Sequence, residues 1–265
     1  KAGLCSGAGN WTLKSVERLD VPQITVTDGP HGLRLQKSGE GAHSVKAVCF
    51  PPGCASACSF DTALLEEIGA AIAAHCREEK VDVILGPAVN IKRSPLGGRN
   101  FEYYSEDPLL AGELAAAFIR GVQKNGVGTS IKHFLANNQE TRRLSGSAEV
   151  EERTLREIYM PAFEIAVKKA KPWTVMSSYN KINGEYVSDS GEYLTDVLRG
   201  EWGFDGVVVS DWGAVNNRVT NLKAGLDLEM PYSGGERDTE IAEAVRSGRL
   251  DEAVLDRAVA RILKL

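Results

Sequence analysis

Five places in the sequence put a polar or charged side chain at the end of a short apolar run that resembles a β-strand. One such residue is explained better by a turn or a helix cap than by function. Five together favour a shared site, because the carboxyl ends of barrel strands meet at one rim where active sites are built. The residues are Asp28, Lys132 with His133, Tyr179, Asp211 and Glu229.

Asp211 has the clearest chemical setting, since it follows the apolar run 207–210 and precedes Trp212. A carboxylate in line with an anomeric carbon can attack that carbon or stabilise an oxocarbenium ion, and an indole can stack on the sugar ring. The pair therefore predicts chemistry on glycosides. The alternative for Asp211 is a cap at the start of the next helix.

Basic residues near these positions can serve as hydrogen-bond donors to a sugar. Lys132 and His133 are adjacent, so their two side chains can donate hydrogen bonds to two neighbouring hydroxyls of one sugar. Arg99 and Arg143 lie in long loops, where they add donors and keep Asp28 and Asp211 ionised, although each could instead form a surface ion pair. The remaining histidines, which we assign to a turn, a loop and a helix without a chemical role, are His31, His43 and His75. No set of ligand residues has metal-site spacing, and we expect no metal.

Short β-branched runs alternate with helical stretches along the chain, in the order typical of βα units around a parallel sheet. No GxGxxG follows the first run, which disfavours a dinucleotide-binding open sheet. We expect one α/β domain folded as a TIM-like (β/α)8 barrel, distorted or incomplete in its first third. The expected strands are 22–27, 81–85, 128–132, 173–178, 206–210 and 226–229, with a shorter seventh at 48–50.

Capping residues mark the expected helices. Asp61 and Asp107 each precede a stretch with helical spacing of apolar residues, and Asp107 is followed by a proline at the first helical position. Two more helices are expected around 155–163 and from about Asp251. The stretch 86–107 is too long for an ordinary connection, so we expect it to line a pocket or to pack on the barrel.

Composition limits the class of protein. The chain has 265 residues, 43% of them hydrophobic, and a net charge of −5, which suits a full core and argues against a nucleic-acid surface. No apolar run approaches the roughly 18 residues that span a bilayer, so no membrane partner is expected. Five cysteines without metal-site spacing are interpreted as mostly buried thiols of a cytoplasmic protein. A bridge within Cys49, Cys54 and Cys58 is the alternative, and the triplet 10–12, a glycosylation sequon, leaves secretion open.

Five motifs occur along the chain in this order: TDGPHGLR (27–34), GPAVNIKRSPLGGRNFEYYSEDP (86–108), KHFLANNQETRR (132–143), MSSYNKINGE (176–185) and VVVSDWGA (207–214). Together they resemble glycoside hydrolase family 3, the β-glucosidase group. The resemblance spans about residues 13–265 and implies a TIM-like barrel whose start is distorted or incomplete in some members. It implies hydrolysis of terminal non-reducing β-D-glucosyl residues by a retaining mechanism, without a cofactor, on β-linked oligosaccharides or aryl glycosides. A β-xylosidase or an arabinosidase is the alternative within the family.

The resemblance also implies a role for each matching residue. Asp211 matches the nucleophile, and Asp28 matches the carboxylate that binds the outer hydroxyls of the terminal sugar. Tyr179 matches the tyrosine beside the nucleophile, and Trp212 matches the stacking wall. The other hydroxyl ligands are Arg99, Lys132, His133 and Arg143.

Family β-glucosidases take their acid/base glutamate from a following α/β sandwich domain, so residues 1–265 are expected to be the barrel domain alone. We assign that acid to none of Glu102, Glu140 and Glu229. The β-N-acetylhexosaminidase branch is disfavoured, because no second histidine follows the KHF motif. Two other classes stay open: a Schiff-base lyase that uses Lys132, and a carbohydrate-binding barrel without catalysis.

Overall fold

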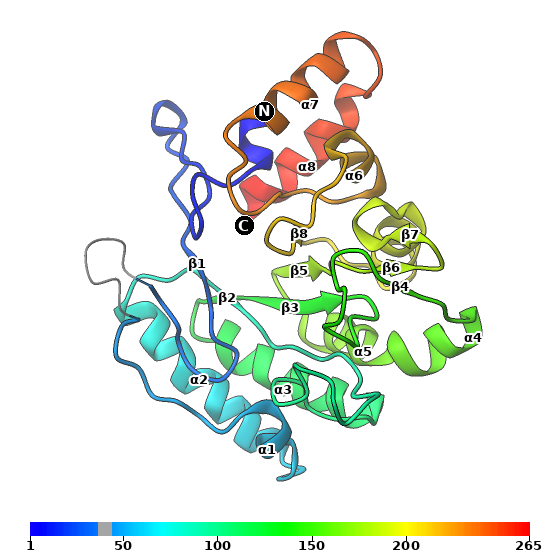
Figure 1. Cartoon of the computed structure of the whole chain (residues 1–265). Helices are drawn as coiled ribbons and strands as arrows, with labels where there is room; N and C mark the ends of the chain where they lie inside the picture. Colours follow the sequence, from blue (N-terminus) through cyan, green and yellow to red (C-terminus); the bar gives the residue numbers. More distant parts are fainter. Residues whose placement is uncertain (37–43) are drawn as a thin grey trace.

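The structure is a computed structural model that describes residues 1–36 and 44–265. In this part of the chain, a sheet of five parallel strands runs in the order β1-β2-β3-β5-β8 (Figure 1). Because every neighbouring pair is parallel, the carboxyl ends of all five strands face one rim, and the predicted α/β barrel architecture is confirmed. The strands are β1 (Val26–Asp28), β2 (Val83–Leu85), β3 (Gly128–Phe134), β5 (Thr174–Ser177) and β8 (Val207–Ser210).

The remaining part of the barrel wall consists of irregular segments. Leu228 forms a parallel bridge beside β8, and the next residue, Glu229, bridges Ser6. The N-terminal segment then reaches the opposite edge of the sheet, where the Val26 N–H donates to the Trp11 carbonyl at 2.8 Å. The barrel is therefore distorted both in the N-terminal segment and where that segment meets 226–229.

Two expected strands differ from the structure. The segment 226–229 pairs through isolated bridges only, and residues 48–50, which lie in the described part, form no strand. Pro51 and Pro52 follow directly and have no N–H to continue a ladder, which explains the second error. A small second sheet consists of β4 (Ser147–Ala148), β6 (Lys181–Ile182) and β7 (Glu185–Tyr186).

Helices cover the outside of the sheet (Figure 1). The side chain of Asp61 accepts hydrogen bonds from two backbone N–H groups at the start of α2, and Asp107 does the same for α3, as predicted. The helix expected around 155–163 is divided into α4, a π-type turn (Leu155–Tyr159) and α5, which starts at Pro161. The α-helices are α1 (Gly53–Ala57), α2 (Thr62–Glu78), α3 (Pro108–Gln123), α4 (Glu152–Thr154), α5 (Pro161–Ala170), α6 (Arg218–Ala224), α7 (Glu236–Arg246) and α8 (Glu252–Lys264). A π-type helix (Glu192–Glu201) precedes β8.

The cysteines differ from the prediction. All five lie in the described ranges and are free, but only Cys5 and Cys76 are buried, while Cys49 and Cys58 are exposed. The expectation of mostly buried thiols was therefore wrong. Within residues 1–36 and 44–265, no helix is long and apolar enough to cross a bilayer.

Candidate active site

A cavity of about 400 Å³ is lined by residues at the carboxyl ends of the strands. The eight residues to which the family resemblance assigns a role all contribute to its wall, although they come from strands and loops far apart in the chain. The lining residues are Trp11, Asp28, Arg34, Leu85, Arg99, Lys132, His133, Arg143, Met176, Tyr179, Asp211 and Trp212. We call this cavity the sugar pocket.

Asp211 follows the last residue of β8 and is 8% exposed. Its Oδ1 accepts the Trp212 N–H at 2.7 Å, whereas its Oδ2 takes no hydrogen bond within the part of the chain that the structure describes. The nearest basic atom to Oδ2 is Nε2 of His133 at 3.8 Å, which is too long for a hydrogen bond. Helix α6 is capped by Asn217, so Asp211 is not its N-cap. One oxygen of the carboxylate is therefore buried without a hydrogen-bond partner.

Burial raises the pKa of the Asp211 carboxyl above its usual value. The Trp212 N–H and the charges of Lys132 and Arg99 act in the opposite direction, without cancelling the effect of burial. A buried carboxylate with few hydrogen bonds is a better nucleophile than a well-solvated one, provided that nearby cations keep it ionised. The surroundings of Asp211 meet both conditions.

Charges of alternating sign form a chain that includes four residues of the sugar pocket and Glu102 behind them. Lys132 lies at its centre, 3% exposed, with its Nζ 2.7 Å from Asp28 Oδ1 and 3.4 Å from Glu102 Oε1. Arg34 approaches Asp28 Oδ2 at 3.3 Å, and Arg99 pairs with Glu102 Oε2 at 2.7 Å. Each buried charge thus has a partner of opposite sign, as a low-dielectric site requires.

These contacts fix the charge states. Burial acts to raise the pKa of Asp28, but Lys132 and then Arg34 outweigh it, so the pKa is lowered and the group is an anion. Burial acts to lower the pKa of Lys132, but Glu102 and Asp28 outweigh it, so the pKa is raised and the group is a cation. A Schiff-base lysine needs a depressed pKa. The Lys132 environment therefore argues against the lyase alternative.

His133 is held rigidly at the end of β3. Its backbone N–H donates to Asn90 Oδ1 at 2.8 Å, its carbonyl accepts from Asn90 Nδ2 at 2.9 Å, and the Tyr103 hydroxyl lies 3.4 Å from Nδ1. Burial, followed by the charges of Arg99 and Lys132, lowers the pKa of His133 well below its usual value. A neutral imidazole in this position can donate or accept one hydrogen bond with a substrate hydroxyl.

An aromatic and cationic wall stands beside Asp211. The Arg143 guanidinium lies 4.7 Å from the centre of the Tyr179 ring, and the Tyr179 hydroxyl donates to the Trp212 carbonyl at 2.8 Å. The Trp212 indole N–H donates to the Asn10 carbonyl at 2.8 Å, and its ring packs against Trp11 with centroids 5.4 Å apart. The indole is thereby fixed as one face of the pocket.

Three polar or aromatic residues of the site were not predicted from the sequence, and Glu229 was predicted there wrongly. Arg34 stands in the motif 27–34 but was not singled out, Trp11 comes from the irregular N-terminal segment, and Glu102 was considered only as a candidate acid. Glu229 does not line the sugar pocket. It lies 4.0 Å from Arg237 and accepts a hydrogen bond from Ser233.

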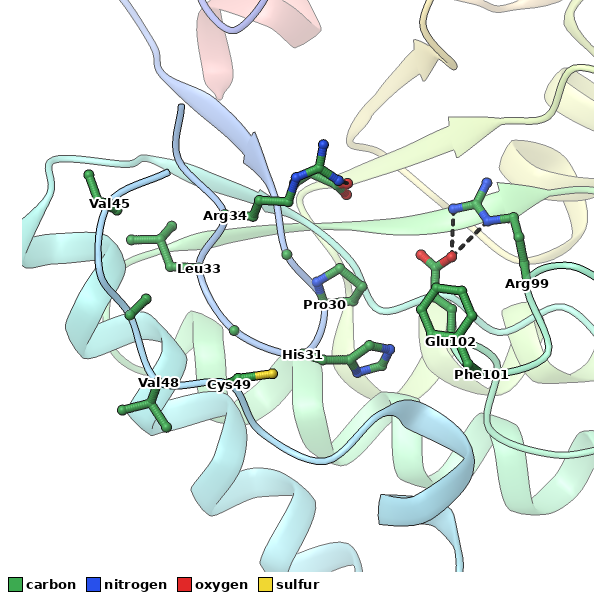
Figure 2. A pocket seen from close by; sticks show the side chains of 14 residues that line it. Pro30, His31, Leu33, Arg34, Val45, Val48, Cys49, Arg99, Phe101 and Glu102 are labelled. Carbon is green, nitrogen blue, oxygen red and sulfur yellow. Dashed lines mark hydrogen bonds and ion pairs between the residues drawn. The ribbon is translucent and has the colours of Figure 1, made fainter. Parts of the chain in front are cut away.

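A second hollow of about 450 Å³ adjoins the sugar pocket and shares Asp28, Arg34 and Arg99 with it (Figure 2). Its wall includes His31, whose Nε2 accepts the Gly53 N–H at 3.3 Å, consistent with the predicted structural role. His75 lies in α2 as expected, and His43 lies outside the described residues. Asp211 does not line this hollow, so the sugar pocket is the better candidate for the chemistry.

Metal ligation finds no support in the geometry. Within the described ranges, no group of three or more histidine, cysteine, aspartate or glutamate side chains could hold a metal ion.

A rim carboxylate with one unpartnered oxygen, beside fixed indoles and alternating charges on a parallel barrel, is the arrangement expected of a barrel that binds carbohydrate. Residues 10–265 match the family model of the glycosyl hydrolase family 3 N terminal domain, and the chain belongs to this family.

Curated relatives include thermostable β-glucosidase B of Acetivibrio thermocellus, 59% identical over all of this chain and 36% of its own length. An exo-α-(1→6)-L-arabinopyranosidase of Bifidobacterium longum is 53% identical over all of this chain and 35% of its own. Among solved structures, β-glucosidase 3B of Thermotoga neapolitana in complex with glucose superposes with a TM-score of 0.95 at 47% identity. That match covers 99% of this chain and 40% of the other. The chain thus spans well under half the length of these relatives.

Proposed function

We propose that this chain is the part of a retaining exo-β-glycosidase that carries the nucleophile and binds the terminal sugar, with β-D-glucosides as the substrate class. The observation that carries the proposal is the free Oδ2 of buried Asp211, in a pocket lined by Asp28, Lys132 and His133. Relatives named β-glucosidase support the choice of sugar. The arabinopyranosidases among the relatives make an arabinopyranoside the second candidate.

In the first step, Asp211 Oδ2 attacks the anomeric carbon and the bond to the leaving oxygen breaks. The leaving oxygen takes the bonding electron pair and a proton from an acid. In the second step, water loses a proton to the same group and attacks the anomeric carbon, which releases the carboxylate. Asp28, Lys132 and His133 hold the sugar hydroxyls, and Trp212 supplies a flat apolar wall.

The acid comes from outside the described residues in this proposal. The carboxyl groups that line the sugar pocket, among residues 1–36 and 44–265, are those of Asp28 and Asp211. Asp28 is ion-paired with Lys132 and has a lowered pKa, so it does not hold a proton to donate near neutral pH. We therefore propose that a domain following residue 265 in the full-length protein supplies the acid/base carboxyl.

The stereochemistry of the product tests this function. Hydrolysis of 4-nitrophenyl β-D-glucoside by the full-length protein is followed by proton NMR at early times, before the sugar mutarotates. The proposal expects β-D-glucose as the first product, because two displacements restore the configuration. Appearance of α-D-glucose first means a single displacement by water and excludes Asp211 as the nucleophile.

The pH dependence of kcat/KM gives an independent prediction. Asp211 must be ionised to attack, and burial raises its pKa, so activity is expected to fall with decreasing pH through a midpoint above the ordinary aspartate value of about 4. Asp205→Asn changes an exposed carboxyl that pairs with Lys264, and it should leave the profile unchanged. A midpoint at or below the ordinary value contradicts the proposed environment of the nucleophile.

A further inference from the structure

Glu102 is buried, although it lies in the long connection between β2 and α3. It is 5% exposed, and its carboxylate faces the Arg99 guanidinium, as Figure 2 shows. Both Nε and Nη2 of Arg99 lie 2.7 Å from Glu102 Oε2. The other oxygen, Oε1, lies 3.4 Å from Lys132 Nζ. One carboxylate therefore contacts two of the cations that line the sugar pocket.

Glu102 itself does not line the sugar pocket. It borders the second hollow instead, which Asp211 does not line. Arg99 binds one of its oxygens and Lys132 lies beside the other, so the carboxylate contacts these two cations and does not line the sugar pocket. A direct role as acid or nucleophile is therefore inconsistent with its position.

Arginine and lysine side chains have many rotamers, and holding one in a single geometry costs conformational entropy. Arg99 and Lys132 also carry like charges near each other, and Lys132 is almost completely buried. Without an anion between them, repulsion and freedom of rotation would move both groups away from a sugar. Because two N–H groups of the Arg99 guanidinium donate to the same carboxylate, both the position and the plane of the guanidinium are restricted.

We propose that Glu102 is a positioning residue, which sets the orientation of Arg99 and Lys132 so that both bind hydroxyls of the terminal sugar. The inference rests on the proposed function of the sugar pocket. It extends that function to a residue that touches no substrate.

The test compares Glu102→Gln with Glu106→Gln in the full-length protein. Glu106 lies on the same connection but is exposed, so it is a matched control. Each protein is assayed on 4-nitrophenyl β-D-glucoside and on its monodeoxy analogues. In the parent protein, removal of a hydroxyl bound by Arg99 or Lys132 should lower kcat/KM by about 10²-fold or more.

In Glu102→Gln, kcat/KM on the intact glucoside should fall by about 10²-fold, and the penalty for one or two of the deoxy substrates should shrink to less than about 10-fold. Glu106→Gln should behave as the parent. A Glu102→Gln protein with unchanged kcat/KM, or with an equal loss on every deoxy substrate, overturns the inference, because a general structural defect does not discriminate between hydroxyls.

Glu102→Asp provides a second variant if Glu102→Gln fails to fold. It retains the charge on a shorter side chain that reaches the two cations less well, so the deoxy penalties should fall below those of the parent. A Glu102→Asp protein that folds but loses kcat/KM equally on the glucoside and on every deoxy analogue also contradicts the inference. Labelling of the parent protein by a fluorinated glucoside separates the failure of this inference from the failure of the proposed function. If Asp211 is not labelled, the proposed function is wrong. If Asp211 is labelled but the Glu102 variants discriminate between the deoxy substrates as the parent does, only the role of Glu102 is wrong.

Discussion

Replacement of Asp211 by asparagine should lower kcat/KM on an aryl β-glucoside by at least about 10⁴-fold, which is typical for loss of a nucleophile. The amide has no negative charge to attack the anomeric carbon, while the Trp212 N–H can still bond to its oxygen. The measurement is steady-state kinetics on the full-length protein, with Asp205→Asn as a control for removal of an exposed carboxyl.

Thermal unfolding distinguishes lost chemistry from lost structure in this variant. The raised pKa of Asp211 means that the folded protein disfavours the ionised carboxyl relative to the unfolded chain. At neutral pH the Asp211→Asn protein, which has a neutral amide at this position, should therefore unfold at the same temperature as the parent or at a higher one. Such stabilisation is common when a functional residue is replaced. An Asp211→Asn protein that retains more than a hundredth of the parent activity contradicts the assignment.

Replacement of Lys132 by methionine should lower kcat/KM by about 10²- to 10³-fold, the usual cost of removing one partner of a buried charge pair. The change leaves Asp28 and Glu102 facing each other without the cation between them, and it removes a donor to the sugar. Kinetics on 4-nitrophenyl β-D-glucoside measure the effect. The pKa of Asp28 should rise as well, since Lys132 is the main group that lowers it.

Lys124→Met is a suitable control for this variant, because Lys124 is an exposed lysine that pairs with Glu66 on the helical surface. It should retain full activity, since exposed ion pairs contribute little. If Lys132→Met stays within about 10-fold of the parent while it remains folded, the chain of alternating charges has no role in the binding of the sugar.

Much of the site was predictable because the relevant information is local. Asp211 stands at the end of an unbroken apolar run, and Lys132 and His133 lie at the end of another. Once such runs pair in parallel, their carboxyl ends meet at one rim, and residues more than 100 positions apart in the chain become neighbours. The caps at Asp61 and Asp107 are local in the same sense.

The remainder depends on contacts that no short window contains. The barrel wall next to β8 is completed by the N-terminal segment, whose pairing with Glu229 joins residues more than 200 positions apart. Arg34 and Glu102 lie in connecting loops, and their positions depend on ion pairs with Asp28 and Lys132. The sequence around them has no helical or strand periodicity from which these contacts could be predicted. The burial of the cysteines was mispredicted for a related reason. Cysteine is buried in most proteins on average, but this average does not say whether a particular cysteine is buried.

The most direct test of the central claim is covalent labelling of the full-length protein with 2-deoxy-2-fluoro-β-D-glucosyl fluoride. Fluorine at carbon 2 slows breakdown of the glycosyl-enzyme, and the fluoride leaving group needs little help from an acid, so the experiment reports on the nucleophile alone. Peptide mass spectrometry should find one fluoroglucosyl group on Asp211. A label on any other carboxyl, or inactivation of Asp211→Asn at the rate of the parent, would contradict the account.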